Sequence, residues 1–216
     1  MKAHLLLTHG AGASCQSDFM QQLAIALRAE QIKVTLFNFS YMQARFTSLT
    51  KRPPPKAVLL VPELTQALAE LTTDLPLFIG GKSMGSRVAS LWAAQQGKEL
   101  SSVDNSNESK IRAVFAYGYP FHPPRKDSWR TEHFDALKIP LHIMQGERDP
   151  FGSKPELADN KELQQMVWPN VTVNWLPTAD HDFKPLKSSG LTQAELIQQA
   201  AKLTSRYIDA VITKSE

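Results

Sequence analysis

The feature that most constrains the fold is a regular alternation of short apolar runs with longer segments of helical periodicity. Turn-forming residues bound each run, as expected for the buried strands of a parallel sheet. This alternation predicts an α/β fold: a mostly parallel, doubly wound sheet of about six strands with helices on both faces. We expect strands at about Ala3–Thr8, Lys33–Phe39, Leu75–Ile79, Ala113–Tyr117, Leu141–Gln145 and Val171–Leu176.

The segments between these runs carry the helical periodicity. Helices are expected at about Asp18–Glu30, Met84–Gln96 and Thr192–Ile212. The last of them begins with Thr192 and Glu195, which have the spacing of a capping box. Another helix is expected after a run of three prolines, with Pro62 starting or kinking it. The polar segment 101–110 lacks apolar periodicity, so we expect an exposed connection there.

Composition narrows the class of protein. With 216 residues, of which 42% are apolar, the chain suits a single domain spanning residues 1–216. The formal charge is only +3 and the basic residues are scattered, which argues against nucleic acid as a partner. Cys15 is the only cysteine, so an intramolecular disulfide is excluded. The run Leu5–Leu7 is too short for a signal peptide and no run approaches a membrane span, which favours a cytoplasmic protein.

The stretch FIGGKSMGSRVAS fits two motifs that imply different chemistry. Its GKS resembles the end of a phosphate-binding loop, whereas GKSMG fits G-x-S-x-G with Ser83 at the centre. A phosphate-binding loop needs a glycine five residues before Gly81, but Pro76 stands there and has no N–H group. A buried strand precedes the motif and a helix follows it. The stretch therefore predicts a nucleophile elbow, with Ser83 as the nucleophile.

A serine nucleophile needs a histidine base and a carboxylate that orients the base. In a fold of this kind these follow the serine in the order acid, then histidine. Asp149 lies just past a predicted strand, and His181 lies in the loop between the last strand and the last helix. We therefore expect Ser83, Asp149 and His181 to be catalytic. Asp180 is a rival acid, and Glu147 could also serve if the turn is shifted.

Acyl transfer also requires N–H donors for the oxyanion. The residue after the nucleophile, Met84, supplies one by position, and the glycine-rich loop after the first strand supplies the other, with Ala11 as the best candidate. The same loop could instead be a dinucleotide-binding turn. However, Cys15 occupies the place of the third glycine in G-x-G-x-x-G.

Five segments in order, LLLTHGAGA, GGKSMGSRVAS, YGYPFHPP, QGERDPFG and ADHDF, resemble the α/β-hydrolase superfamily over nearly the whole chain. They are most similar to its small lidless members, dienelactone-hydrolase-like proteins and the KANL and testis-expressed hydrolase-like family. The resemblance implies Ser83, Asp149 and His181 as the triad, and Met84 and Ala11 as the oxyanion donors. It also implies that the first antiparallel hairpin of larger relatives is missing and that segment 118–140 replaces their lid, leaving an open site.

The resemblance implies a serine hydrolase that cleaves an ester, thioester or related acyl bond of a small molecule, with no metal or organic cofactor. Lys82 departs from the pattern, because many esterases carry His, Asp or Glu there, and it implies an altered field at the nucleophile. The alternative is a catalytically weak or inactive hydrolase-fold interaction protein, since fold alone does not establish function.

The loop after the fourth predicted strand offers candidates for the substrate pocket. Its aromatic residues could line an acyl pocket or simply pack on the end of the sheet: Tyr119, Phe121, His122 and Trp129. Four basic residues could bind an anionic substrate, although charged loops are usually only solvated: Arg125, Lys126, Arg130 and Arg148.

Overall fold

A computed structural model describes residues 1–47, 53–99, 111–124, 128–160 and 168–213. Within these residues the chain forms a six-stranded, all-parallel sheet in the order β2-β1-β3-β4-β5-β6. The strands are β1 (Ala3–Thr8), β2 (Ile32–Phe37), β3 (Leu77–Lys82), β4 (Ile111–Tyr117), β5 (Leu141–Gly146) and β6 (Val171–Leu176). The parallel, doubly wound sheet expected from the sequence is confirmed.

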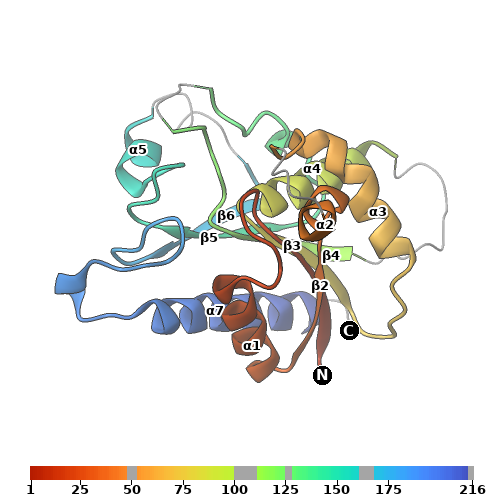
Figure 1. The fold of residues 1–216 in the computed structure, drawn as a ribbon, viewed down its shortest axis with the longest axis horizontal. Coiled ribbons are helices and arrows are strands. Elements are labelled where there is room, and N and C mark those ends of the chain that lie inside the picture. Colours follow the sequence, from red (N-terminus) through yellow and green to blue (C-terminus); the bar gives the residue numbers. More distant parts are fainter. Residues whose placement is uncertain (48–52, 100–110, 125–127, 161–167, 214–216) are drawn as a thin grey trace.

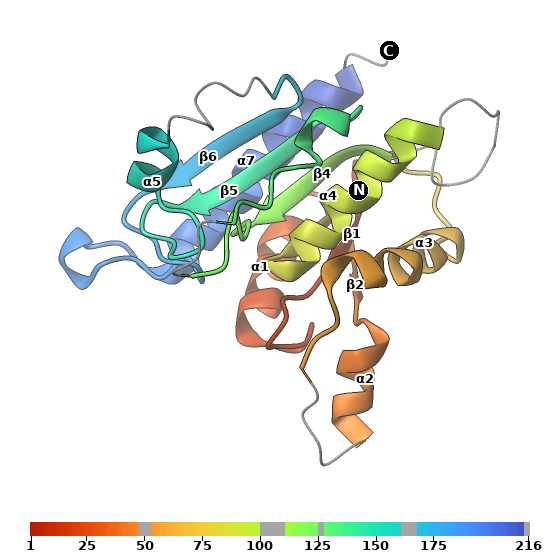
Figure 2. The same cartoon turned by 90° about the horizontal axis from the view of Figure 1, so that it is seen from above.

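Helices cover both faces of the sheet (Figures 1 and 2). On one face lie α1 (Asp18–Ala29) and α7 (Gln193–Thr213), which pack against each other, and on the other lie α3 (Val61–Ala69) and α4 (Met84–Glu99). The helix expected after the prolines begins as a 3-10 turn, η1 (Ala57–Leu60), and continues into α3 with Pro62 in its first turn. The segment 101–110 lies outside the described residues.

Two short helices were not expected. The first, α2 (Ser40–Thr47), follows β2, and the second, α5 (Lys154–Asp159), follows β5. Ser153 caps α5 and forms a capping box with Glu156. Between β4 and β5, the described part of segment 118–140 contains only the 3-10 turn η3 (Phe134–Ala136) as regular structure. A lid domain is therefore not inserted in that part of the chain.

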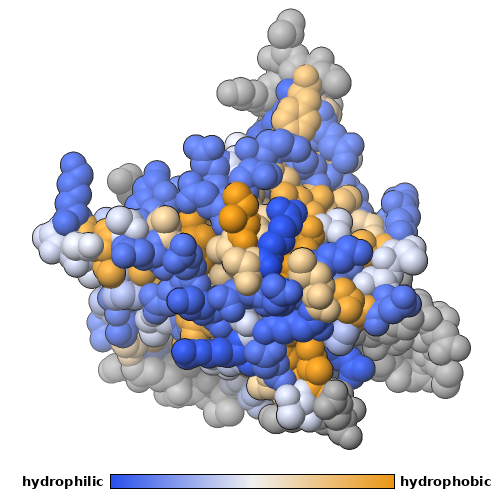
Figure 3. Space-filling view, turned by 90° about the horizontal axis from the view of Figure 1, so that it is seen from below, coloured by the Kyte–Doolittle hydropathy of each residue, from blue (hydrophilic) through white to orange (hydrophobic). Residues whose placement is uncertain are grey.

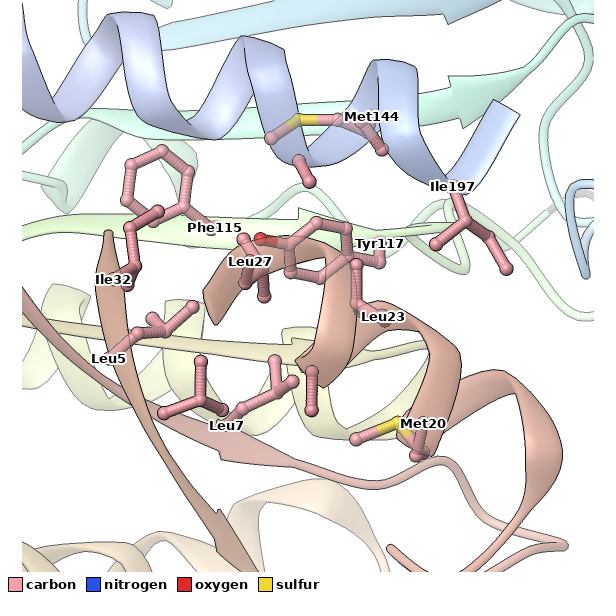
Figure 4. Close-up of a cluster of buried hydrophobic side chains, with 14 of the residues drawn as sticks. Leu5, Leu7, Met20, Leu23, Leu27, Ile32, Phe115, Tyr117, Met144 and Ile197 are labelled. Carbon is pink, nitrogen blue, oxygen red and sulfur yellow. The ribbon is translucent and has the colours of Figure 1, made fainter. Parts of the chain in front are cut away.

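The core beneath α1 and α7 is built from one face of the central strands and the apolar stripes of the two helices. Figure 4 shows side chains of β1 and β4 meeting those of α1 and α7 in one cluster. Tyr117 lies fully buried in this cluster, and its hydroxyl forms a hydrogen bond with Thr204 Oγ1 at 2.9 Å, so the polar group of the ring is satisfied. The outer face of the two helices is mostly hydrophilic, with scattered apolar residues (Figure 3).

The order of the strands decides where a site can form. From β1 the chain first moves outward to β2 and then returns to place β3 on the other side of β1. The loops that leave β1 and β3 therefore diverge at adjacent carboxyl ends, where Thr8 pairs with Gly81. In open α/β sheets such a switch point leaves a crevice for ligands. Among the described residues, no helix is both long enough and apolar enough to cross a membrane.

Candidate active site

Ser83 lies in a sharp turn between β3 and α4, at the switch point. Its backbone has a φ of 52°, a left-handed conformation that is unfavourable for a residue with a side chain. The Ser83 N–H donates to the carbonyl of Tyr117 at 3.1 Å, which extends the pairing of β3 with β4 into the turn. The turn thus holds the Ser83 side chain above the carboxyl edge of the sheet.

The two glycines of the motif allow this turn because the backbone there is crowded. A Cβ on Gly81 would lie 2.6 Å from the nitrogen of Ser86 and closer still to Gly85 and Thr8. A Cβ on Gly85 would lie 2.6 Å from the carbonyl oxygen of His9. Because real Cβ atoms do not approach backbone so closely, neither position has room for a side chain. The absence of side chains at these two positions lets the end of β1, the end of β3 and the start of α4 approach one another closely.

The three residues expected to form the triad are connected in series by two hydrogen-bonding distances. His181 Nε2 is 2.9 Å from Ser83 Oγ, and His181 Nδ1 is 2.7 Å from Asp149 Oδ2. Asp149 follows β5 and His181 follows β6, so three different strand ends supply the group. Phe151 packs against the His181 ring, with a centroid distance of 4.4 Å. The imidazole is thereby fixed on its face as well as through both nitrogens.

Asp149 is completely buried, and its carboxylate has further partners. Oδ1 accepts from the N–H of Phe151 at 2.8 Å, and Oδ2 accepts from Gln145 Nε2 at 2.9 Å. The carboxamide oxygen of Gln145 accepts from the N–H of Tyr119 at 2.7 Å. This bond fixes the amide so that its NH₂ faces the carboxylate. A role for Gln145 was not expected from the sequence, where it is only the last residue of a predicted strand.

The rival carboxylates are engaged elsewhere. Asp180 Oδ1 accepts from the backbone N–H groups of Asp182 and Lys184, both at 2.9 Å, and so shapes the loop that carries His181. Glu147 accepts from Lys154 Nζ at 2.8 Å and from the N–H of Thr178 at 3.0 Å. These contacts lower the pKa of Glu147, the bond from Lys154 most of all. Both residues therefore stabilise local loops.

Lys82 is a buried cation beside the nucleophile. Its Nζ donates to the carbonyl of His181 at 2.8 Å and lies 3.4 Å from Asp182 Oδ1. It also lies over the ring of Phe19, 5.2 Å from the centroid. Burial lowers the pKa of Lys82, whereas Asp182 and other nearby carboxylates oppose the change. Lys82 thus connects the end of β3 directly to the loop that carries the histidine.

The glycine-rich loop after β1 is held in place by a buried neutral histidine. His9 Nδ1 is 2.6 Å from the carbonyl of Gly10, and His9 Nε2 accepts from the N–H of Phe39 at 3.2 Å. Because Nε2 must be an acceptor, the ring carries its single proton on Nδ1. Burial lowers the pKa of His9, which favours the same neutral form.

The unexpected helix α2 fixes the other side of this loop. Tyr41 Oη donates to the carbonyl of Ala11 at 3.1 Å, and Arg45 Nη1 donates to the same oxygen at 3.4 Å. The Arg45 guanidinium also lies over the Tyr41 ring, 5.2 Å from the centroid. The carbonyl of Ala11 is thus held from α2 by two donors. Met84, the other expected donor, is the first residue of α4, where N–H groups have no acceptor within the helix.

Two cavities open on either side of Ser83, and both are bordered by Ala11, Ser83 and Phe151. The first cavity has a volume of about 540 Å³, and its other lining residues include Phe19, Lys82, His181, Asp182 and Lys184. The second cavity has a volume of about 610 Å³, and its other lining residues include Pro55, Lys56, Val58, Met84, Arg87, Leu91, Pro120, Arg130 and Glu132. Both volumes suit a small-molecule ligand.

The aromatic residues that could line a pocket pack at the end of the sheet, three of them buried and Trp129 half-buried. Tyr119 and Phe121 are fully buried, His122 is nearly so, and Trp129 packs edge-on against His122. None of the four borders either cavity. Gly118, with a φ of 70°, turns the chain just after β4, and Tyr119 and Phe121 then pack with Phe134 against the α4 side of the sheet. Of the two interpretations that the sequence left open for these residues, these contacts favour packing at the end of the sheet.

Of the four basic residues considered as anion ligands, Arg125 and Lys126 lie outside the described residues. Arg148 Nε donates to the carbonyl of Thr178 at 2.8 Å and does not border either cavity. Arg130 borders the second cavity. Arg87 and Lys56 border it as well, although the sequence alone had not singled them out.

Comparison with known proteins places this geometry in context. A family model described as an alpha/beta hydrolase domain matches residues 1–209. A dienelactone hydrolase from Anabaena variabilis is 19% identical, with a TM-score of 0.63 over 97% of this chain and 87% of that one. Est1E from Butyrivibrio proteoclasticus is 12% identical, with a TM-score of 0.59 over 96% of this chain and 88% of that one.

A third similar structure is ClbQ from the colibactin NRPS/PKS pathway, with 14% identity and a TM-score of 0.63 over 99% of both chains. No similarity to a curated protein was found. At these identities the solved structures establish the fold, while the family match covers nearly the whole chain. The parallel sheet, the strained turn at Ser83 and the family match together show that this chain belongs to the alpha/beta hydrolase family.

Proposed function

We propose that this hydrolase is a serine hydrolase that cleaves an ester, thioester or related acyl bond through an acyl-enzyme intermediate. The observation that carries the proposal is the continuous chain of hydrogen-bonding distances from Ser83 through His181 to Asp149. A serine hydroxyl is a weak nucleophile on its own and needs an adjacent base that is itself oriented. The proposed substrate is a small molecule, and the proposed location is the cytoplasm.

In the proposed reaction, Ser83 Oγ attacks the carbonyl carbon while His181 Nε2 removes the hydroxyl proton. Asp149 holds the tautomer with the proton on Nδ1 and stabilises the imidazolium that forms. The tetrahedral intermediate then collapses, and His181 donates its proton to the departing alcohol or thiol. Water, deprotonated by His181, releases the acid and regenerates Ser83.

The oxyanion of the tetrahedral intermediate needs donors that are already in place. We propose the N–H groups of Met84 and Ala11. Met84 begins α4, so its N–H lies at the positive end of a helix dipole. Ala11 borders both cavities, and its carbonyl accepts a hydrogen bond from Tyr41. The two donors would approach the carbonyl oxygen from the elbow and from the β1 loop.

Labelling with a fluorophosphonate tests the proposal directly, because such a probe phosphonylates an activated serine. We expect stoichiometric labelling at Ser83, detected by mass spectrometry of the peptide that contains it. Labelling should be lost in Ser83→Ala and in His181→Ala. Well-folded protein that takes up no probe would overturn the proposal and favour a role in protein interaction instead.

Lys82 gives a second prediction, as a positioning residue for His181. In Lys82→Met the bond to the His181 carbonyl is lost while most of the apolar volume remains, so we expect kcat to fall about 10- to 100-fold with KM little changed. Steady-state kinetics on an activated ester measure kcat and KM, and denaturation in urea measures the stability of the variant. A fall in kcat matched by a comparable loss of stability would indicate only a packing role for Lys82.

A further inference from the structure

We propose that the second cavity is an anion subsite and that the natural substrate carries a carboxylate in addition to the bond that is cleaved. The inference rests on the proposed function and names its substrate class. The second cavity is bordered by three cationic side chains, Lys56, Arg87 and Arg130, and by the single carboxylate of Glu132. The first cavity is different, because its lining contains two cations, Lys82 and Lys184, and two carboxylates, Asp18 and Asp182.

Arg87 is tied to the nucleophile by the geometry of α4. It lies four residues after Ser83, and its N–H donates to the Ser83 carbonyl at 3.2 Å, so the two residues share one helical face. The Arg87 side chain is 21% exposed, and its Nη2 lies 3.1 Å from Glu132 Oε1. Arg87 therefore already has an anionic partner on the solvent side.

Arg130 has no such partner among the described residues. No carboxylate there lies within ion-pairing distance of its guanidinium. Its backbone is fixed on both sides, because its N–H donates to the Phe121 carbonyl at 2.7 Å and its carbonyl accepts from Tyr119 Oη at 2.8 Å. Both of these aromatic residues are fully buried. Arg130 thus presents a half-buried cation from a rigid base.

The two guanidinium groups are close enough to influence each other. Burial lowers the pKa of Arg130, and the positive charge of Arg87 lowers it further. Glu132, two residues after Arg130, is exposed and paired with Arg87. The carboxylate of Glu132 is thus engaged with Arg87, and an anion arriving in the second cavity would find in Arg130 a cation that no carboxylate of the described residues pairs with. A planar guanidinium suits a carboxylate, which it can bind through two parallel bonds.

Between the nucleophile and these cations the walls of the second cavity are mainly apolar, formed by residues such as Met84, Leu91, Pro120 and Phe151. A ligand that fits this arrangement has its reactive carbonyl at Ser83, a short hydrocarbon segment, and a carboxylate at the far end. A monoester of a dicarboxylic acid has this form. An ester whose alcohol carries the carboxylate also has this form. The experiment distinguishes a carboxylate on the acyl group from one on the alcohol.

The test compares charged esters with uncharged ones of the same shape. On the acyl side these are para-nitrophenyl glutarate and para-nitrophenyl isoheptanoate. On the alcohol side they are para-acetoxybenzoate and para-isopropylphenyl acetate. We expect kcat/KM for the charged ester to exceed that of its isostere by about tenfold or more in one of the pairs, as for one charge-assisted hydrogen bond. The preference should shrink as salt is added, because the side chains are only partly buried.

Variants decide whether the second cavity is responsible. Arg130→Gln should bring the ratio of charged to uncharged kcat/KM close to one. Glu132→Gln should increase the ratio, because it frees Arg87 for the substrate. The matched control is Arg112→Gln, which makes the same change at an exposed position near the amino end of β4, away from the site. It should leave both rates and their ratio as in the unaltered protein.

Two kinds of failure are distinguishable. Equal hydrolysis of charged and uncharged esters in both pairs, or a preference that persists in Arg130→Gln, would overturn the anion subsite and leave the serine hydrolase intact. Failure to hydrolyse any of the esters, together with absence of fluorophosphonate labelling, would overturn the proposed function itself.

Discussion

Replacing His181 with alanine is expected to lower kcat for ester hydrolysis by about 10⁵- to 10⁶-fold, while the protein stays folded. The imidazole is the only group in the described residues within hydrogen-bonding distance of Ser83 Oγ, so nothing else there could take the proton. Because the triad acts as a unit, the double variant Ser83→Ala/His181→Ala should be little worse than either single variant. Stopped assays on an activated ester, with circular dichroism to check folding, measure both effects.

Two carboxylates allow a matched control for the acid. Asp149→Asn should lower kcat by about 10⁴-fold, because an amide facing Nδ1 favours the wrong tautomer of His181. Asp180→Asn removes the same charge one residue from His181, but its remaining side-chain oxygen can still accept from the N–H groups of Asp182 and Lys184. We therefore expect at most a small loss in Asp180→Asn. Comparable losses in both variants would contradict the assignment of Asp149.

Replacing Gly81 with alanine is expected to destabilise the fold by about 2 to 4 kcal/mol, measured as the free energy of unfolding in urea. The new methyl group would meet the backbone of Gly85 and the side chain of Thr8, and neither can move without displacing β1 or α4. The loss arises where the ends of two central strands and one helix meet. It should therefore appear as a lower denaturation midpoint with a similar dependence on urea.

Gly12 provides the control for this prediction. It lies in the glycine-rich loop close to the same site, yet a Cβ there would meet nothing within 4 Å. Gly12→Ala should therefore change the free energy of unfolding by no more than about 0.5 kcal/mol. If Gly81→Ala were equally harmless, the close approach of β1, β3 and α4 at the elbow would be wrong.

Strand positions followed well from the sequence where polar residues bound an apolar run. β1 and β6 have the predicted limits, because the apolar run of β1 lies between the polar Lys2 and His9 and that of β6 between Asn170 and Pro177. β3 was placed too early, because Gly80, Gly81 and Lys82 suggested a turn. In the structure these residues continue the ladder, with Lys82 opposite Tyr117. Composition could not reveal that β3 extends to Lys82, because pairing with β1 and β4 on either side keeps these residues in the sheet.

The missed helices show two different limits. α5 has a recognisable signal in Ser153 and Glu156, the capping box that also marked the start of α7. α2 has no comparable signal, since its apolar residues do not form a clear stripe. Its position depends on contacts across the fold, such as the bonds from the Ser40 N–H and hydroxyl to Glu63 at 2.7 and 2.8 Å. Such long-range contacts cannot be read from local pattern.

The members of the candidate triad could be chosen from the sequence because chain order and strand ends limit the choices. The side chains that surround and position the triad could not be chosen in this way. Gln145 acts through a bond to Asp149 that depends on how the amide is turned by Tyr119. Lys82 reaches a carbonyl 99 positions away along the chain. For the aromatic residues after β4 the sequence left pocket lining and packing both open, because the left-handed turn at Gly118 decides which way that loop runs.

The position of Ser83 between two cavities has a consequence for how the proposed reaction could be redirected. Among the described residues only Ala11, Ser83 and Phe151 border both spaces, so the two halves of a cleaved substrate would leave the serine along separate routes. With the acyl group still held on one side, the other side is free to admit the acceptor. Alcohols or amines added to the medium would then compete with water for the acyl-enzyme. Changes confined to one cavity would alter the choice of acceptor without altering the choice of acid, which makes the fold a natural starting point for an acyltransferase.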